Sequence, residues 1–277
     1  CRLRPPDDSA HHVGRLVSEE QAGHEFQRLD IGHAAGVGVG EVVLRKTSRN
    51  LQTSTVGTSV VLNMLRKLVD TYQPKYMAVV FDAKGKTFRD ELYPQYKAHR
   101  PPMPDELSSQ VPPLLELVSA SGLPMLQVPG VEADDVIGTL AGQATEAGWK
   151  TVISTGDKDL AQLVNEQVSL INTMSDSVMD DQGVADKFGV APEQIIDFLS
   201  LVGDSADNIP GIPKVGPKTA AKWLSQYGSL DELVAHAGDV KGKVGENLRA
   251  HLDQLPLSKE LATIRCDLEL GVDLHDL

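Results

Sequence analysis

Hydrophobic and polar positions follow a regular pattern along this chain only after about residue 60. Continuous apolar runs with the length of strands covered on both faces occur at 76–81, 150–154 and 168–172. Apolar residues recur with helical spacing over 60–72, 105–120, 133–147 and 159–164. This alternation of strands and helices predicts an α/β fold with a mostly parallel central sheet and flanking helices.

The two ends of the chain differ from this central part. After residue 190 short helical patterns are joined by Gly/Pro turns, which predicts a helical lobe. The first 60 residues keep no steady period, and their one candidate strand is Glu41–Leu44. We therefore expect an irregular segment over 1–60, an α/β domain over 61–188 and a helical lobe over 189–277.

Composition narrows the class of protein. Hydrophobic residues make up 41% of the 277 positions, enough for a substantial core. The 39 acidic and 26 basic side chains give a net charge of −13, which argues against a general polyanion binder. The charge does not exclude a nucleic-acid enzyme whose basic residues cluster on one face. Two cysteines form no disulfide framework, and neither a signal peptide nor an apolar run of about 20 residues occurs, so we expect a cytoplasmic protein without membrane contact.

Acidic residues follow predicted strands or open predicted helices at four places. They are Asp82; Glu132, Asp134 and Asp135; Asp157 and Asp159; and Asp204 and Asp207. Ligands of parallel sheets gather at the carboxyl ends of the strands, so we expect these groups to converge. Oxygen ligands without His or Cys favour Mg²⁺ or Mn²⁺ over Zn²⁺. So many carboxylates suggest two ions, about 3.5–4 Å apart, as in phosphodiester hydrolysis.

A structural interpretation competes with this metal site. Each acidic group alone is explained equally well by helix capping or turn formation, whereas four groups at one edge favour metal binding. The histidines His11, His12, His24 and His33 are spaced irregularly and are expected to be solvated loop residues. The glycine-rich run at 36–40 follows no clear strand and opens no helix, so we do not expect a phosphate loop there.

The segment 84–104 combines basic and aromatic residues. Arg89, Tyr93, Lys97 and Arg100 are spaced by four, four and three positions, which places them on one predicted helical face with Tyr96 beside them. Such a face suits single-stranded nucleic acid, because cations contact phosphates and rings stack on bases. A solvated face with long basic side chains is an equally good explanation.

A second candidate for nucleic-acid contact is the stretch "GIPKVGPKTAAKWL" at 211–224. Its glycines flank a predicted tight hairpin that leads into a helix. The free N–H groups and positive dipole end of that helix can hold a backbone phosphate, and Lys214 and Lys218 add charge. The alternative is a plain Gly/Pro turn.

Four motifs in this order resemble the 5′-nuclease domain of bacterial DNA polymerase I, within the flap endonuclease family. They are "VVFDAKGKTFRDELYPQYKAHRPPMPDEL" (79–107), "GVEADDVIGTLA" (130–141), "ISTGDKDLAQLV" (153–164) and "GDSADNIPGIPKVGPKTA" (203–220). The resemblance implies a monomeric nuclease, normally fused to polymerase domains, that acts on DNA with 5′ flaps or nicks and on RNA-primed DNA.

The resemblance also implies roles for individual residues. Two Mg²⁺ ions, replaceable by Mn²⁺, would be held by Asp82, Glu132, Asp134, Asp135, Asp157, Asp159, Asp204 and Asp207. The catalytic residues would be Asp82, Asp134 and Asp157, with Lys97 and Arg100 near the scissile phosphate. Residues 84–104 would form an arch for the 5′ strand, and 204–227 a helix-hairpin-helix element, with K⁺ as an additional ion at the hairpin. DNA contacts would come from Lys86, Arg89, Tyr96, Lys97, Arg100, Gly211, Lys214, Gly216, Lys218 and Thr219.

The chain departs from the family at its start. The family opens with a sheet strand ending in Val-Asp-Gly-Ser, whose Asp binds metal, and nothing in 1–60 matches it; Asp30 is the nearest candidate. We therefore expect that residues 1–57 are not the family's sequence, that the resemblance begins near Val61, and that the sheet lacks a good central strand.

Three functions remain open on these observations. The first is the flap nuclease. The second is a branched-DNA-binding remnant that cuts poorly for want of one metal ligand. The third is a PIN-like nuclease acting on RNA, which the arch and the hairpin argue against. Mg²⁺-dependent cutting, binding without cutting, and RNA preference would distinguish them.

Overall fold

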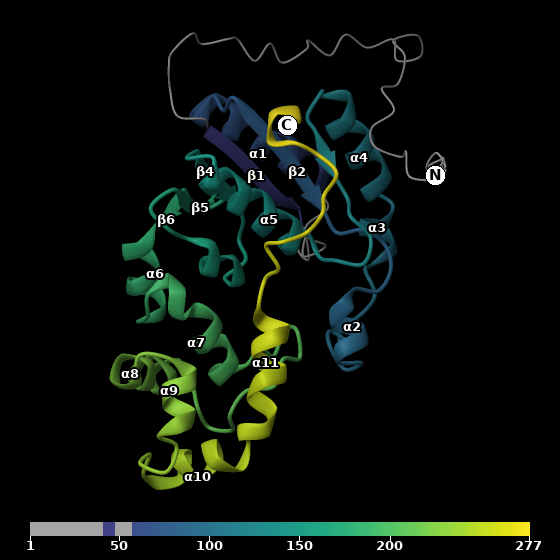
Figure 1. Cartoon of the computed structure of the whole chain (residues 1–277). Coiled ribbons are helices and arrows are strands. Elements are labelled where there is room, and N and C mark those ends of the chain that lie inside the picture. Colours follow the sequence, from purple (N-terminus) through teal and green to yellow (C-terminus); the bar gives the residue numbers. More distant parts are fainter. Residues whose placement is uncertain (1–40, 48–56) are drawn as a thin grey trace, which may run out of the picture.

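A six-stranded sheet forms the centre of the molecule (Figure 1). The computed structural model describes residues 41–47 and 57–277. The strands are β1 (Glu41–Thr47), β2 (Tyr76–Phe81), β3 (Met125–Leu126), β4 (Lys150–Ser154), β5 (Val168–Asn172) and β6 (Ser177–Met179). Their order is β3-β2-β1-β4-β5-β6, and every pairing is parallel except that of β6. The predicted α/β class with a mostly parallel sheet is confirmed.

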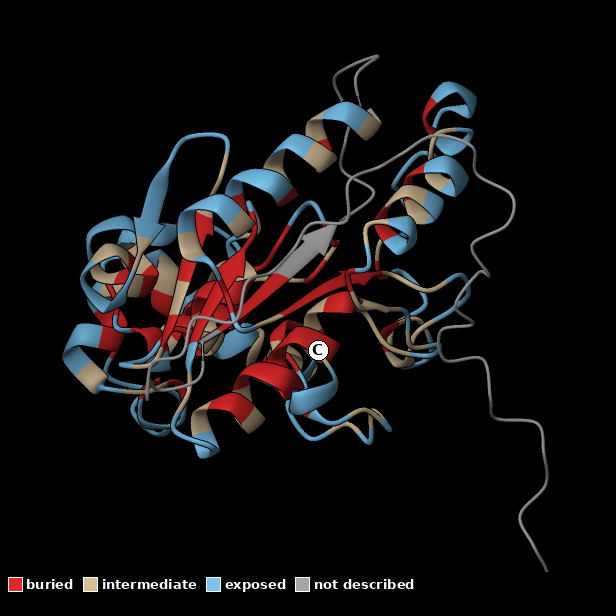
Figure 2. Ribbon diagram, turned by 90° about the horizontal axis from the view of Figure 1, so that it is seen from above, coloured by how far each residue is buried: buried red, intermediate tan, exposed pale blue. Residues whose placement is uncertain are grey.

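Helices cover both faces of this sheet, because the strands alternate their apolar side chains between two core clusters. Val43 of β1, Val79 of β2 and Val152 of β4 belong to one cluster, which α1 (Gly57–Tyr72) and α4 (Val111–Ala120) complete. Leu44 and Ile153 belong to the other, which α5 (Ala133–Glu146) completes. Figure 2 shows the buried strands lying between these helical layers.

The centre of the sheet is occupied by β1, so the expectation of a missing central strand is wrong. β1 pairs in parallel with β2 on one side and β4 on the other. Its residues Val42–Leu44 are fully buried, because three consecutive apolar residues fill a strand position covered on both faces. The irregular segment expected over 1–60 is therefore wrong for 41–47, and α1 begins at Gly57. Asp30, the four early histidines and the glycine-rich run lie outside the described residues.

The helical lobe continues the core that α5 begins, since Phe198, Leu224 and Leu248 join the same cluster. Its helices are α6 (Asp181–Phe188), α7 (Ile195–Val202), α8 (Pro217–Tyr227), α9 (Leu230–Ala235), α10 (Gly242–Ala250) and α11 (Leu255–Ala262). Short 3₁₀ turns lie at η1 (Asp159–Leu163), η2 (Pro192–Gln194), η3 (Leu252–Gln254) and η4 (Leu274–Asp276).

After α11 the chain returns from the lobe to the α/β part (Figure 1). Ile264 packs so closely on α5 that a Cβ at Gly138 would lie 2.6 Å from it. Near the end of the chain, His275 lies 3.0 Å from the hydroxyl of Tyr76, which itself stacks on Trp149. These contacts fix the lobe against the sheet.

The basic segment 84–104 does not form one long helix. It contains only α2 (Phe88–Leu92), and α3 (Asp105–Ser108) follows it. The helix ends because Tyr93, which precedes Pro94, is extended with φ of −141°, and a residue before proline disfavours the helical region. The predicted single helical face of Arg89, Tyr93, Lys97 and Arg100 is therefore wrong.

In the described part of the chain, no helix has both the length and the apolar character to cross a membrane.

Candidate functional site

The predicted acidic groups are carried by elements that end or begin at one edge of the sheet. The register pairs Thr47 with Phe81, so the central strand ends level with β2, and Asp82 follows β2 directly. Asp82 is tied to the next group, since its Oδ1 accepts a hydrogen bond of 2.9 Å from the N–H of Ala133, where α5 begins. Asp134 lies in that first turn of α5. The orientation of parallel strands thus brings these groups together, as predicted from the sequence.

Glu132 and Asp207 are bridged by the turn that follows α2. The Tyr96 hydroxyl lies 3.0 Å from Glu132 Oε2 and 3.2 Å from Asp207 Oδ2. Lys97 forms an ion pair with Glu132 and lies 3.4 Å from Asp207, which also pairs with Arg100. Burial, together with the negative charges of Glu132 and Asp207, raises the pKa of Tyr96 far above its ordinary range. Tyr96 is itself buried, so in this structure it is a hydrogen-bond donor to the carboxylates and not an exposed stacking surface.

A second cluster consists of Asp157, Asp159 and Asp204. Burial, followed by the charges of Asp157 and Asp204, raises the pKa of Asp159 to about 7. Asp159 Oδ1 is buried and accepts no hydrogen bond from the described residues. Lys158 Nζ lies 2.8 Å from Asp204 Oδ2, and although burial lowers the pKa of Lys158, its hydrogen bond and attraction to Asp204 raise it overall. This cluster carries more negative charge than Lys158 neutralises.

Asp135 and Arg89 form a buried ion pair and not parts of an open site. Their exposures are 0% and 2%. Arg89 donates from Nη1 and Nη2 to the two carboxylate oxygens of Asp135 at 2.7 and 2.8 Å, and Asp135 also accepts from the N–H of Arg265 at 3.0 Å. Burial alone would lower the pKa of Arg89, but the hydrogen bonds and charge of Asp135 raise it. Because both partners are satisfied inside the protein, this geometry does not support Asp135 as a metal ligand or Arg89 as a DNA contact.

The oxygen ligands at this edge are of the kind that divalent cations prefer, although they do not surround one common point. Among residues 41–47 and 57–277, no three His, Cys, Asp or Glu side chains are arranged to hold one ion together. Lys97, Arg100 and Lys158 instead neutralise the carboxylates. A group of carboxylates that binds a cation should repel one another when no cation is there to neutralise them. The Asp159 carboxylate agrees with this, since its Oδ1 accepts no hydrogen bond from the described residues and its pKa is raised.

The predicted hairpin at 211–216 forms and leads into α8. A Cβ on Gly211 would overlap the carbonyl of Val202, so only glycine fits there. Gly216 is the N-cap of α8, and no acidic residue follows in the first turn. The positive end of α8 is therefore open to an anion beside Lys218, which is exposed, as are Lys214 and Lys86, while Thr219 is half-buried.

The geometry gives no support to K⁺ at this hairpin. The carbonyl of Gly211 accepts a hydrogen bond from the side-chain amide of Gln254 at 3.2 Å. The carbonyl of Pro213 accepts one from Asn247 at 2.6 Å. Each of these two carbonyls thus already accepts one hydrogen bond from a protein donor.

Family models match nearly the whole described chain. The model "5'-3' exonuclease, N-terminal resolvase-like domain" matches residues 42–189, and "5'-3' exonuclease, C-terminal SAM fold" matches 190–277. The match begins at residue 42 and not near Val61, because it includes the central strand β1. The resemblance that the four motifs indicated is confirmed.

Curated relatives agree with this match. A DNA polymerase I from Pseudomonas aeruginosa is 52% identical over 229 residues, which are 78% of this chain and 25% of the relative. A 5′-3′ exonuclease from Aquifex aeolicus is 44% identical over 216 residues, 78% of this chain and 74% of the relative. The chain thus spans about a quarter of the polymerase I relative and most of the shorter exonuclease.

Solved structures share the fold. The bacteriophage T5 D15 protein co-crystallised with metal ions has a TM-score of 0.70 at 21% identity, covering 80% of this chain and 88% of that chain. The catalytic core of Rad2 in complex with DNA substrate has a TM-score of 0.54 at 18% identity, covering 86% and 83%. The PIN-like sheet and the helical lobe therefore occur together in these structures as they do here.

Proposed function

The chain belongs to the 5′-3′ exonuclease family, and we propose that it hydrolyses phosphodiester bonds of DNA near the junction between a 5′ single strand and a duplex. The observation that carries this proposal is the acidic edge, where contacts link carboxylates after β2 and β4, at the start of α5 and in the loop after α7. Two of these carboxylates, Glu132 and Asp207, pair with Lys97 and Arg100. The products would be a 5′-phosphate and a 3′-hydroxyl. Flapped, nicked and RNA-primed DNA are the proposed substrates.

We propose that Asp82, Glu132, Asp134, Asp157, Asp159, Asp204 and Asp207 hold the cations at this edge. When bound, two divalent cations such as Mg²⁺ would neutralise charge on the phosphate and lower the pKa of a water. Lys97 and Arg100 lie on the same carboxylates, so their charges are placed to contact the phosphate that is cut. The open N-terminus of α8, with Lys214 and Lys218, would hold the duplex backbone at a distance from the cutting edge.

The test is cleavage of a labelled 5′-flap DNA with Mg²⁺ and with EDTA, alongside binding of the same DNA in Ca²⁺. Asp157→Ala or Asp134→Ala should abolish cutting and spare binding. Lys218→Ala should weaken duplex binding and lower its salt dependence by about one phosphate contact. Equal loss of cutting and binding in all three variants would indicate misfolding and contradict these roles.

The DNA-binding remnant remains a second candidate because of one observation. The described central strand, Glu41–Thr47, ends in Arg45, Lys46 and Thr47, none of which is acidic, level with the strands that lead to Asp82 and Asp157. Retained flap binding in Ca²⁺ with no Mg²⁺-dependent cutting would support this candidate. A labelled RNA of the same shape, cut in preference to DNA, would favour the PIN-like ribonuclease instead.

A further inference from the structure

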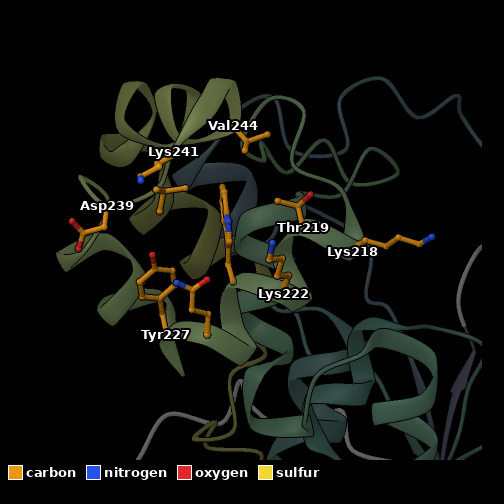
Figure 3. A pocket seen from close by; sticks show the side chains of 10 residues that line it. Lys218, Thr219, Lys222, Tyr227, Asp239, Lys241 and Val244 are labelled. Carbon is orange, nitrogen blue, oxygen red and sulfur yellow. The ribbon is translucent and has the colours of Figure 1, made fainter.

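A cavity of about 570 Å³ lies in the helical lobe, away from the acidic edge. It is formed by α8, the turn 239–241 and the start of α10. Figure 3 shows Lys222 and Tyr227 on α8, with Lys241 and Val244 across the opening from them. Its volume lies within the range of about 300–1,000 Å³ that is usual for small-molecule sites.

The cavity is locally positive in an acidic chain. Lys218, Lys222 and Lys241 line it together with one carboxylate, Asp239. Within the described residues none of these lysines forms an ion pair. Although the chain has a net charge of −13, three lysines without an ion pair to any described residue line this one cavity. This arrangement favours an anionic ligand.

Two helix N-termini add to this positive potential. Lys218 lies in the first turn of α8, and Lys241 is the N-cap of α10. Both helices lack an acidic residue in the first turn, and neither has a side-chain cap. Their positive dipole ends are therefore uncompensated where they border the same cavity, which suits a phosphate.

The rest of the lining suits a flat ring. Trp223 is only 5% exposed, and its indole Nε1–H donates to no group within 41–47 or 57–277. This N–H is therefore available to donate to an acceptor on a ligand. Tyr227, Val240 and Val244 complete an apolar and aromatic wall.

From these features we propose that the cavity binds a nucleoside phosphate unit. The base lies against Tyr227 and Val244 and accepts a hydrogen bond from Trp223 Nε1, while the phosphate lies between Lys222, in the middle of α8, and Lys241, at the N-terminus of α10. The unit is either a free nucleotide or an unpaired nucleotide of a DNA strand. This site does not depend on the metal chemistry of the acidic edge.

Tryptophan fluorescence tests the proposal directly, because the chain has two tryptophans. In the variant Trp149→Phe, which keeps a ring against Tyr76, Trp223 is the single reporter. Thymidine 5′-monophosphate, thymidine and inorganic phosphate are titrated separately, followed by a DNA duplex with and without an unpaired terminal nucleotide. Lys222→Ala and Lys241→Ala are the test variants. Lys243→Ala is the matched control, since Lys243 is next to the cavity in sequence but pairs with Glu246.

We expect a saturable change in Trp223 fluorescence with thymidine 5′-monophosphate, and weaker binding of thymidine or inorganic phosphate alone. Each lysine variant should weaken it by about tenfold, as for one charge-assisted contact, and Lys243→Ala should not. A response to the unpaired DNA nucleotide without a response to free nucleotide would support the site and identify DNA as its source. No saturable response to any of these ligands, or equal loss in Lys243→Ala, would overturn the proposal. Because cleavage is not measured, failure here is separate from failure of the proposed nuclease.

Discussion

At the scale of single residues, the acidic edge is held together against its own repulsion. Burial and the charges of Asp157 and Asp204 raise the pKa of Asp159 from 3.8 to about 7. The folded protein therefore holds this proton more tightly than the unfolded chain does. The resulting stabilisation is complete below about pH 4 and is lost as the pH rises through about 7.

Asp159→Asn mimics the protonated side chain, which leads to the first prediction. Without divalent ions at pH 8, we expect the variant to raise the free energy of unfolding by on the order of 2 kcal/mol. At pH 4 the free energies of unfolding of the variant and the parent protein should be equal. Urea denaturation at both pH values measures this, with Asp253→Asn at an exposed position as control. A stabilisation that does not change with pH would contradict the assigned cause.

The second prediction concerns Arg89, which sequence analysis assigned to DNA. Arg89→Ala leaves the Asp135 charge buried without its partner, so the free energy of unfolding should fall by about 3–5 kcal/mol. Lys86→Ala, an exposed neighbour, should change it by less than about 0.5 kcal/mol. Chemical denaturation checks both variants. If Arg89→Ala instead weakened DNA binding and left stability unchanged, the buried ion pair would not be its main role.

Residue identities were predictable from the sequence where the chain itself brings them to the edge. Asp82 follows β2 directly and Asp157 comes three positions after the end of β4, so strand direction alone predicts on which edge of the sheet they lie. The partner of Arg89 was not predictable, because Asp135 lies 46 positions away and the pair depends on tertiary packing. The same limit hid the bond of Tyr96 to Glu132, which is 36 positions away.

At the scale of elements, the hairpin before α8 depends on one glycine more than on the other. Gly211 packs on the carbonyl of Val202 at the end of α7, whereas a Cβ at Gly216 would meet open space. As the third prediction, Gly211→Ala should lower the free energy of unfolding by about 1–3 kcal/mol and weaken duplex binding, because the hairpin must shift. Gly216→Ala is the matched control and should cost less than about 1 kcal/mol.

Thermal denaturation and fluorescence anisotropy with duplex DNA measure both glycine variants. Similar losses in the two would mean that helix capping, and not the close approach to Val202, determines the hairpin. Gly216→Ala also keeps the φ of −105° that α8 needs at its N-cap, so backbone strain does not enter the comparison.

Elements were predicted well where the apolar period was clear and poorly where local signals competed. The strands at 76–81, 150–154 and 168–172 occur with the predicted bounds. The helix expected across 84–104 ends at Leu92, because Pro94 keeps Tyr93 out of the helical conformation. The prediction followed the spacing of the basic residues and gave this proline too little weight. The central strand was doubted because it lacks the family motif, although its three apolar residues suffice to pair and bury it.

At the scale of the whole molecule, the proposed nuclease would have to bring DNA, a polyanion, to an acidic edge of an acidic protein. The net charge of −13 and the unscreened carboxylates around Asp159 oppose the approach of phosphate. The open positive end of α8 offers attraction elsewhere on the surface. We therefore expect cations at the acidic edge to affect the binding of flapped DNA more than that of plain duplex.

The fourth prediction follows from this separation. At constant ionic strength, replacing EDTA by Ca²⁺ should tighten binding of a 5′-flap DNA by about tenfold or more, as expected for removing a close like-charge repulsion. Binding of a blunt duplex should change less, because its proposed contacts are with α8 and Lys218 and not with the acidic edge. In Asp159→Asn/Asp204→Asn the effect of Ca²⁺ should shrink, since the repulsion that it screens is already reduced. Anisotropy titrations of both DNAs with both proteins measure these differences. An equal effect of Ca²⁺ on flap and duplex would mean that the ion acts on the DNA or on the whole surface, and the acidic edge would lose its assigned part in positioning the strand.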